Sequence, residues 1–246
     1  MRGSGRRAIV AGRVLLLSAG ALLALRPSPV AAQQPGTYTE STTTTVAVRS
    51  GDQEHARTIA RSGTYRVTLR GDTLVVQATA LDLATTTGDE TVRHDTDGFV
   101  GGHWKLLARG DAWRVVAEPF VPAALAEIVD LAGLMGDYFP PAPPLALSVG
   151  LTAPGGDGRT WERLPGDGVV ARLAWTRQRD IDTVRTMADS LGVAVHERVT
   201  ERGEGSWTDG GVVGWSRRVT TTSDSRVAGR VISARVAEVV RVERVP

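Results

Sequence analysis

The chain has 246 residues, of which 41% are hydrophobic and 23% are charged, with a formal net charge of +2. It contains no cysteine, which excludes disulfide bonds, a thiol nucleophile and a thiolate metal site. Nearly all of the positive charge is arginine, because Lys105 is the only lysine, so the charge balance indicates no particular phosphate site.

The first 32 residues have the arrangement of a secretory signal peptide. Residues 1–13, MRGSGRRAIVAGR, are basic, residues 14–25, VLLLSAGALLAL, are apolar, and small residues precede Gln33. We therefore expect cleavage after Ala32 and a periplasmic or secreted protein. We expect no stable membrane span, because the apolar run is shorter than the about 20 residues that cross a bilayer.

Removal of this segment changes the charge of the chain. Residues 1–32 carry five of the 29 basic residues and none of the 27 acidic ones, so residues 33–246 have a net charge of −3. Such a chain lacks the overall basic balance that is typical of nucleic-acid-binding proteins. We expect no nucleic-acid partner.

Two Arg-Gly-Asp stretches, LRGDTL at 69–74 and LARGDAW at 107–113, predict β-hairpins. The same tripeptide is a cell-adhesion signal, but turn chemistry already explains it, because glycine adopts the positive φ that a type II′ turn requires at its first position. With the Gly-Asp pairs 71–72 and 110–111 as two-residue turns, the apolar residues of each hairpin share one face. The expected apolar pairs are Leu69/Leu74, Val67/Val76, Tyr65/Ala78, Ala108/Trp113, Leu106/Val115 and Trp104/Ala117.

Most of the remaining chain has the composition and alternation of β-strands. Residues 37–49 are rich in threonine and valine, and residues 226–245 alternate between apolar and charged side chains. In this last segment one face is expected to hold Ile232, Ala234, Val236, Val240 and Val242. The pattern predicts a mainly β fold, a curved antiparallel sheet or half-barrel of about nine or ten strands with one or two packed helices.

Two segments have helical periodicity. Residues 122–136, PAALAEIVDLAGLMG, begin with proline, end with glycine and are apolar enough to be buried on most sides. Residues 180–192, DIDTVRTMADSLG, have an acidic N-cap candidate, an apolar stripe and a terminal glycine. Both segments therefore predict helices.

A proline-rich loop, residues 139–158, separates two strand-rich parts of the chain. We expect one antiparallel β domain over residues 33–246, in two loosely similar halves at 33–138 and 159–246. The prolines favour a stiff connection, and recruitment of a partner to an extended proline segment is the alternative.

The densest polar cluster, RHDTDGFVGGHW at residues 93–104, contains His94, Asp95, Asp97 and His103. Histidine and carboxylate ligands at short spacing can bind a divalent metal, whereas an Asx turn before a strand explains the same residues without a metal. The sequence has no G-x-S-x-G, H-E-x-x-H or Walker motif. We therefore expect a protein with no catalytic residues and no cofactor, and not an enzyme.

The six tryptophans have two interpretations. Trp104 and Trp113 are expected on one face of the second hairpin, and Trp175, Trp207 and Trp215 fall in or near strands of the second half. Such residues are most often core, which is the interpretation we favour, and an apolar or carbohydrate-binding groove is the alternative.

The chain resembles a group of uncharacterised bacterial secreted proteins and lipoproteins whose sheets are similar to the half-barrel of LolA-like lipoprotein carriers. The resemblance rests on the signal, the threonine-rich first strand and the segments GGHWKLLARGDAW (101–113), FPPAPPLALSVG (139–150) and TDGGVVGWSRRVTTTS (208–223). It implies an open, curved sheet whose concave face holds an apolar ligand. This sequence lacks the anchor cysteine of the lipoprotein members, so tethering to a membrane is not implied for it.

The sequence thus leads to a non-enzymatic envelope protein that binds a lipid or acyl chain on the concave face of its sheet. The expected lining residues are Tyr65, Val67, Trp104, Leu106, Trp113, Val115, Leu125, Ile128 and Met135. If the helix at 122–136 fills that face, the alternative is a structural or protein-interaction module without a pocket. A second alternative is a metal-assisted hydrolase that uses His94, Asp97 and His103.

Overall fold

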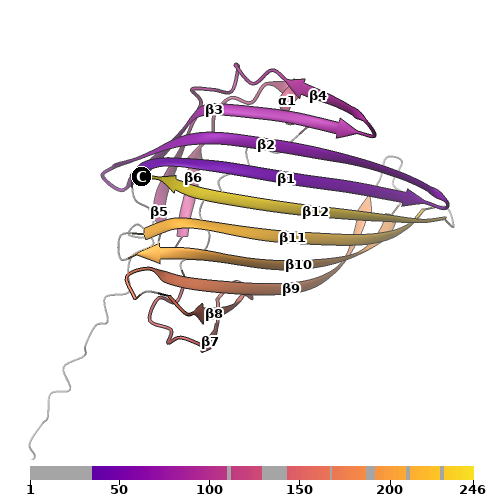
Figure 1. The fold of residues 1–246 in the computed structure, drawn as a ribbon. Helices are drawn as coiled ribbons and strands as arrows, with labels where there is room; N and C mark the ends of the chain where they lie inside the picture. Colours follow the sequence, from indigo (N-terminus) through magenta and orange to yellow (C-terminus); the bar gives the residue numbers. More distant parts are fainter. Residues whose placement is uncertain are drawn as a thin grey trace, which may run out of the picture.

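The computed structural model describes residues 35–109, 112–128, 143–166, 168–186, 192–208, 211–227 and 230–246. In this part of the chain, twelve strands form one antiparallel sheet, accompanied by a single helical turn (Figure 1). The elements are β1 (Gly36–Ser50), β2 (Gln53–Arg70), β3 (Thr73–Thr87), β4 (Glu90–His94), β5 (His103–Arg109), β6 (Ala112–Ala117), α1 (Ala123–Ala126), β7 (Thr152–Pro154), β8 (Thr160–Leu164), β9 (Ala171–Thr186), β10 (Gly192–Thr208), β11 (Gly211–Val227) and β12 (Arg230–Val245). The mainly β, antiparallel prediction is confirmed, but there are more strands and less helix than expected.

The chain enters the sheet at its centre and also ends there. The strand order is β6-β5-β3-β2-β1-β12-β11-β10-β9-β8-β7, and β4 pairs with β3 beside this path. The first half of the chain therefore builds the sheet from the centre outward, and the second half builds it from the opposite edge inward. The two predicted halves are the two wings of one continuous sheet, and β7 lies within the segment 139–158 that was predicted as a loop.

Glycine-aspartate turns join the first four strands of the first wing. Gly51, Gly71 and Gly88 have φ values of +61°, +62° and +59°, and each precedes an aspartate at a hairpin turn. The register predicted for the first Arg-Gly-Asp hairpin is confirmed from Leu69/Leu74 to Tyr65/Ala78. A turn of this kind needs a residue that tolerates positive φ, which is why glycine occupies its first position.

The second Arg-Gly-Asp hairpin is confirmed in part. Its turn, residues 110–111, lies outside the described residues, but Ala108 pairs with Trp113 and Leu106 with Val115 as predicted. Beyond these pairs the register shifts by one, so that Ala117 pairs with Lys105, and the predicted pair Trp104/Ala117 is wrong. The cause is a β-bulge, which places two residues of one strand against one of its neighbour.

The two faces of the sheet differ in character. We call the face that holds the buried aromatic side chains, including Tyr38, Tyr65 and Trp104, the inner face, and the opposite face the outer face. Outer-face positions such as Thr39, Arg66 and Arg198 are exposed. In Figure 1, β5 and β6 lie behind the long strands, so the sheet bends around its inner face.

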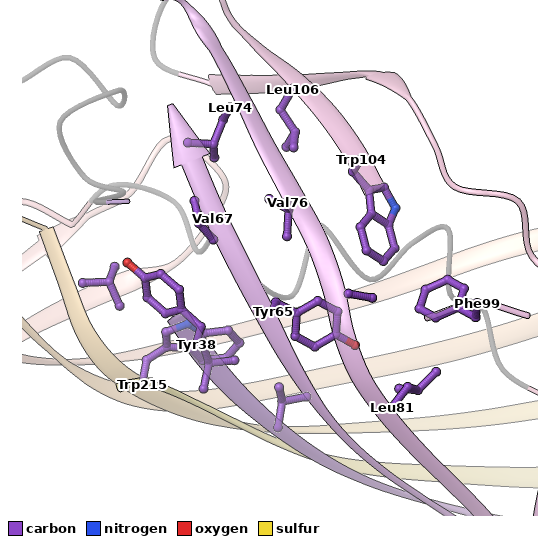
Figure 2. Packing of buried hydrophobic residues seen from close by; sticks show 14 of the residues in the cluster. Tyr38, Tyr65, Val67, Leu74, Val76, Leu81, Phe99, Trp104, Leu106 and Trp215 are labelled. Atoms are coloured by element: carbon purple, nitrogen blue, oxygen red, sulfur yellow. The ribbon is translucent and has the colours of Figure 1, made fainter. Parts of the chain in front are cut away.

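The hydrophobic core occupies one end of the inner face. Figure 2 shows side chains of the central strands and the first wing packed together there, with Tyr65 and Phe99 on either side of Trp104. The ring centroids of Tyr65 and Phe99 lie 6.2 and 5.5 Å from that of Trp104. Phe99 comes from the loop after β4 and Leu125 from α1, so connecting segments of the chain itself cover this end of the sheet.

The predicted helices are corrected by the structure. In the segment predicted as a helix at 122–136, the described part contains only the four residues of α1, and residues 129–136 lie outside the described residues. The helix predicted at 180–192 is wrong for residues 180–186, which continue β9, while residues 187–191 are not described. Pairing of Asp180 with Arg198 and of Asp182 with His196 on β10 prevails over the local helical pattern. None of the described helical segments is long and apolar enough to cross a membrane.

Candidate functional site on the inner face

Cross-strand pairing arranges the inner-face side chains in rows that cross β2, β1, β12, β11, β10 and β9. From the core end outward, these rows divide into three zones. A packed zone holds the hydrophobic core, a charged belt overlaps the outer rows of this zone, and a row of mostly apolar residues lies next to the belt. The side chains of all three zones lie on the same face, because every second side chain of a strand points to that face.

The packed zone contains most of the side chains that the sequence predicted to line a ligand site. Five of them are at most 2% exposed: Tyr65, Val67, Trp104, Leu106 and Leu125. Val115 and Ile128 are partly buried against the same cluster. The side chain of Trp113 and the whole of Met135 lie outside the described residues. The described members are thus brought together, but they pack against one another and against loop residues.

The tryptophans of the second wing belong to the same packed zone, which confirms the core interpretation for them. The ring of Trp175 lies 5.1 Å from that of Trp161 and 6.3 Å from that of Trp215, centroid to centroid. Trp175 lies flat against β10 because Gly203 has no side chain there, and a Cβ at that position would come within 2.2 Å of the indole.

The charged belt is a band of buried and half-buried ion pairs, formed by Glu40, Arg61, Arg159, Arg177, Glu201, Arg217 and Glu238. Its best-enclosed member is Glu201, which is 1% exposed. The Oε1 atom of Glu201 accepts hydrogen bonds from Arg159 Nη2 at 2.7 Å and from the Trp175 indole N–H at 2.8 Å. Arg177 Nη2 lies 2.5 Å from Oε2.

These partners decide the protonation state of Glu201. Burial alone would raise the pKa of the Glu201 carboxyl, because it disfavours the charged form. The hydrogen bonds from Trp175 and Arg159 and the charges of Arg159 and Arg177 outweigh burial and hold the pKa below its ordinary value. Glu201 is therefore an ionised structural anchor at neutral pH and is poorly suited to accept a proton from a substrate.

A second buried pair lies on the other wing of the belt. Arg61 Nη2 is 2.8 Å from Glu40 Oε1, and the Thr42 hydroxyl also donates to Glu40. Between the two wings, Arg217 pairs with Glu238 at 3.0 Å. Each carboxylate of the belt thus has a cationic partner within the chain, so its charges are largely neutralised internally.

Beyond the belt lies the row that we call the distal row. In strand order it consists of Arg57, Val46, Val236, Thr221, Val199 and Arg179. The four middle side chains are half-buried and the two arginines are exposed. None of the six belongs to the core cluster, and none of the three valines is among the partly buried side chains that pack against it. The distal row is therefore a mainly apolar strip of three valines and one threonine with a positive charge at each end.

The predicted metal-ligand candidates are not brought together as a site. His94 Nε2 lies 3.0 Å from the Thr85 hydroxyl, and Asp95 accepts a hydrogen bond from the Asp97 backbone N–H at 2.9 Å, as in an Asx turn. His103 is exposed and pairs with Gln77 of β3. Within the described ranges, no three His, Cys, Asp or Glu side chains are grouped as a metal site requires.

Two hollows lie on the outer face. One, of about 460 Å³, is lined by residues near the ends of β9–β12, among them Val184, His196 and Val231. The other, of about 520 Å³, lies over β1–β4 and includes Ser41, Ser62 and Asp82. Both are open and bordered by exposed polar side chains, and neither contains a residue that the sequence predicted to line the hydrophobic site.

Comparison with known proteins shows a likeness of fold. No protein-family model matches the sequence, and no curated protein sequence does. A structure described by the words "lipid-protein interactions in lipovitellin" aligns with a TM-score of 0.51 at 11% sequence identity, over 87% of this chain and 26% of that chain. This chain therefore spans about a quarter of the length of the lipovitellin chain, and the likeness is one of architecture.

A second structure, P47 from Clostridium botulinum A2, aligns over 79% of this chain and 80% of that chain at 6% identity. Its TM-score is 0.18, which is too low to indicate a shared fold. The LolA-like resemblance expected from the sequence is not among these findings. The findings support a likeness of fold between this chain and part of the lipovitellin chain.

Sequence analysis found only part of the distal row. Alternation in β12 placed Val236 correctly on one face with Val240 and Val242. Of the neighbours of Val236 in the row, Val46 lies on β1, far away in the sequence, and Thr221 lies on the preceding strand β11. Only the β1–β12–β11 pairing identifies them. No local motif in the sequence marks such a cross-strand row.

Proposed function

We propose that this chain binds a hydrophobic ligand, a lipid or an acyl chain, on the distal row, and that it acts by binding and not by catalysis. The observation that supports this most strongly is the apolar strip of the distal row, which the hydrophobic core does not cover. When a ligand removes half-buried apolar side chains from water, the complex is stabilised by about 25 cal/mol per Å² of apolar surface buried.

The proposed site lies on the same face of the sheet as the site expected from the sequence, but further along the strands. The residues first expected to line the site lie in the packed zone, where side chains of the same chain surround them. The distal row lies further along the strands than this zone, and none of its six residues belongs to the core cluster, although Ile59 of that cluster is two residues from Arg57 on β2. A ligand on the distal row therefore requires no rearrangement of the core.

Lipovitellin guides the choice of ligand class. That structure is described by its lipid–protein interactions, and part of it is similar in fold to this chain. We therefore favour a lipid among apolar ligands. We also propose, from residues 1–32 alone, that the chain is exported and meets its ligand in the periplasm or outside the cell.

Native mass spectrometry tests this function. The purified chain is incubated with dioleoylphosphatidylcholine, oleate and oleyl alcohol in turn, and the mass of the folded protein is measured before and after solvent extraction. We expect a one-to-one adduct that organic solvent releases. An unchanged polypeptide mass with all three probes would contradict binding and would support the alternative, a structural or protein-interaction module whose inner face is filled by the chain itself.

A further inference from the structure

The two arginines of the distal row differ from those of the charged belt. Each belt arginine has a carboxylate partner, as in Arg61–Glu40 and Arg177–Glu201. Arg57 and Arg179 are exposed on the same face, and within the described part of the chain neither takes part in an ion pair. The open part of the inner face thus has two positive charges available to a ligand.

The dimensions of the row fit a single acyl chain. The apolar middle extends from Val46 on β1 to Val199 on β10, which is three strand spacings. At about 4.8 Å per spacing this is about 14 Å. An acyl chain in one leaflet of a bilayer spans about half of the about 30 Å hydrocarbon thickness, a closely similar length.

The surroundings of the two arginines are unequal. Arg57 pairs in register with Val46 and Thr87, and on that side the first inner-face acid, Glu90, is two strands away. Arg179 has the acidic residue Glu197 as its diagonal neighbour, so its surroundings are less positive than those of Arg57. A negatively charged head group is therefore favoured at Arg57 over Arg179.

We infer that the ligand is a long-chain carboxylate, of the fatty-acid type, that lies across the strands with its tail on the distal row and its carboxylate at Arg57. This inference rests on the proposed function and adds the chemical class and orientation of the ligand. A guanidinium matches the geometry of a carboxylate and forms charge-assisted hydrogen bonds with it. A neutral amphiphile with the same tail gains only the apolar part of the interaction.

The test measures dissociation constants of the purified chain for oleate and for oleyl alcohol by titration calorimetry. Arg57→Gln is compared with Arg179→Gln, which removes the same charge from the other end of the same row. We expect wild type to bind oleate more tightly than oleyl alcohol. We expect Arg57→Gln to weaken oleate binding by roughly three- to tenfold, with no change for oleyl alcohol, as for a partly exposed ion pair. Arg179→Gln should stay within about twofold of wild type.

The outcomes separate the inference from the function on which it rests. Equal affinity for oleate and oleyl alcohol, or unchanged oleate binding in Arg57→Gln, would overturn the carboxylate assignment while hydrophobic binding stands. Selective weakening in Arg179→Gln would overturn the orientation. If neither probe binds wild type, the inference fails, and if dioleoylphosphatidylcholine also leaves no adduct in mass spectrometry, the proposed function fails with it. Both substitutions are at exposed positions, and circular dichroism confirms that each variant is folded.

Discussion

Single glycines set the packing of the inner face. At Gly203, Trp175 fills the space that a side chain would occupy, and at Gly63 the ring of Tyr65 does the same, with atoms 2.5 to 2.8 Å from an added Cβ. Both glycines lie within strands, where glycine is otherwise unfavourable because it has no side chain to pack. The aromatic ring that covers each glycine explains its presence.

Replacement of Gly203 tests this arrangement. Gly203→Ala places a Cβ 2.2 Å from Trp175 Cζ2, so the indole or the strand must shift. We expect the free energy of unfolding to fall by about 1–3 kcal/mol, as for other overpacked cores. Gly156→Ala is the matched control, since no atom lies within 4 Å of its added Cβ, and it should change stability little. Denaturant unfolding followed by tryptophan fluorescence measures both, and equal stabilities would contradict the packing.

Glu201 makes the protein sensitive to acid. Its pKa is lowered in the folded protein, despite burial, by Trp175, Arg159 and Arg177. Its contribution to stability is therefore fully present above the unfolded-state pKa of about 4.3 and is lost as the pH falls through the lower folded-state pKa. At neutral pH, Glu201→Gln removes the carboxylate that buried Arg159 and half-buried Arg177 share, while Arg159 keeps its ion pair with Asp157, and should cost about 3 kcal/mol.

The pH dependence distinguishes this ion-pair role from simple packing. Unfolding free energies are measured from pH 7 down to pH 3 for wild type, Glu201→Gln and Glu162→Gln, an exposed control on β8. Wild type and Glu162→Gln should lose stability more steeply at the acid end than Glu201→Gln. Parallel profiles for all three proteins would show that Glu201 does not contribute in this way.

At the scale of elements, local turn chemistry was predictable and long strand pairing was not. The Gly-Asp hairpins followed from glycine and alternation, and Leu69/Leu74 and Leu106/Val115 pair as expected. The bulge at Val116, opposite the step from Lys105 to Leu106, left no local signal, because the extra residue does not interrupt the apolar pattern. The segment 180–186 has helical spacing, because Ile181 and Val184 are three residues apart, and only its pairing with β10 makes it a strand.

The outer part of β9 is an edge strand. Hydrogen exchange can therefore test directly whether residues 180–186 form a strand or the helix predicted from the sequence. Pairing with β8 extends only to Thr176, so among the described residues 177–186 pair on one side, with β10. Hydrogen exchange should alternate along this segment with a period of two, protected at amides that bond to β10 and fast at those that face the edge. Uniform protection of consecutive amides would indicate the helix instead.

At the scale of the whole molecule, the first and last strands are partners at the centre of the sheet. The pairing of β1 with β12 joins the two wings and aligns Val46 with Val236. Composition and alternation were sufficient to predict a large antiparallel sheet. They could not predict which end of the inner face is filled, because that depends on where loops such as the one that holds Phe99 fold back.

The proposed site depends on this difference between the two ends of one face. The packed zone has the larger aromatic side chains and was the natural expectation from sequence, yet those residues are buried by their own chain. The distal row has smaller side chains, which come from six different strands. Their common position on one face becomes evident only when these strands are aligned. The central claim is therefore that ligand binding occurs on the inner face, at the distal row.

One pair of substitutions on β12 tests this claim most directly. Val236 lies on the inner face in the distal row, and Val239 lies on the outer face of the same strand, 41% exposed. Affinity for oleate is measured by titration calorimetry for Val236→Gln and Val239→Gln, after circular dichroism has confirmed that both are folded. We expect Val236→Gln to weaken binding by at least about tenfold, because a polar amide replaces apolar surface under the ligand, and Val239→Gln to bind like wild type. Binding that is unchanged in Val236→Gln, or lost only in Val239→Gln, would contradict a ligand site on the inner face.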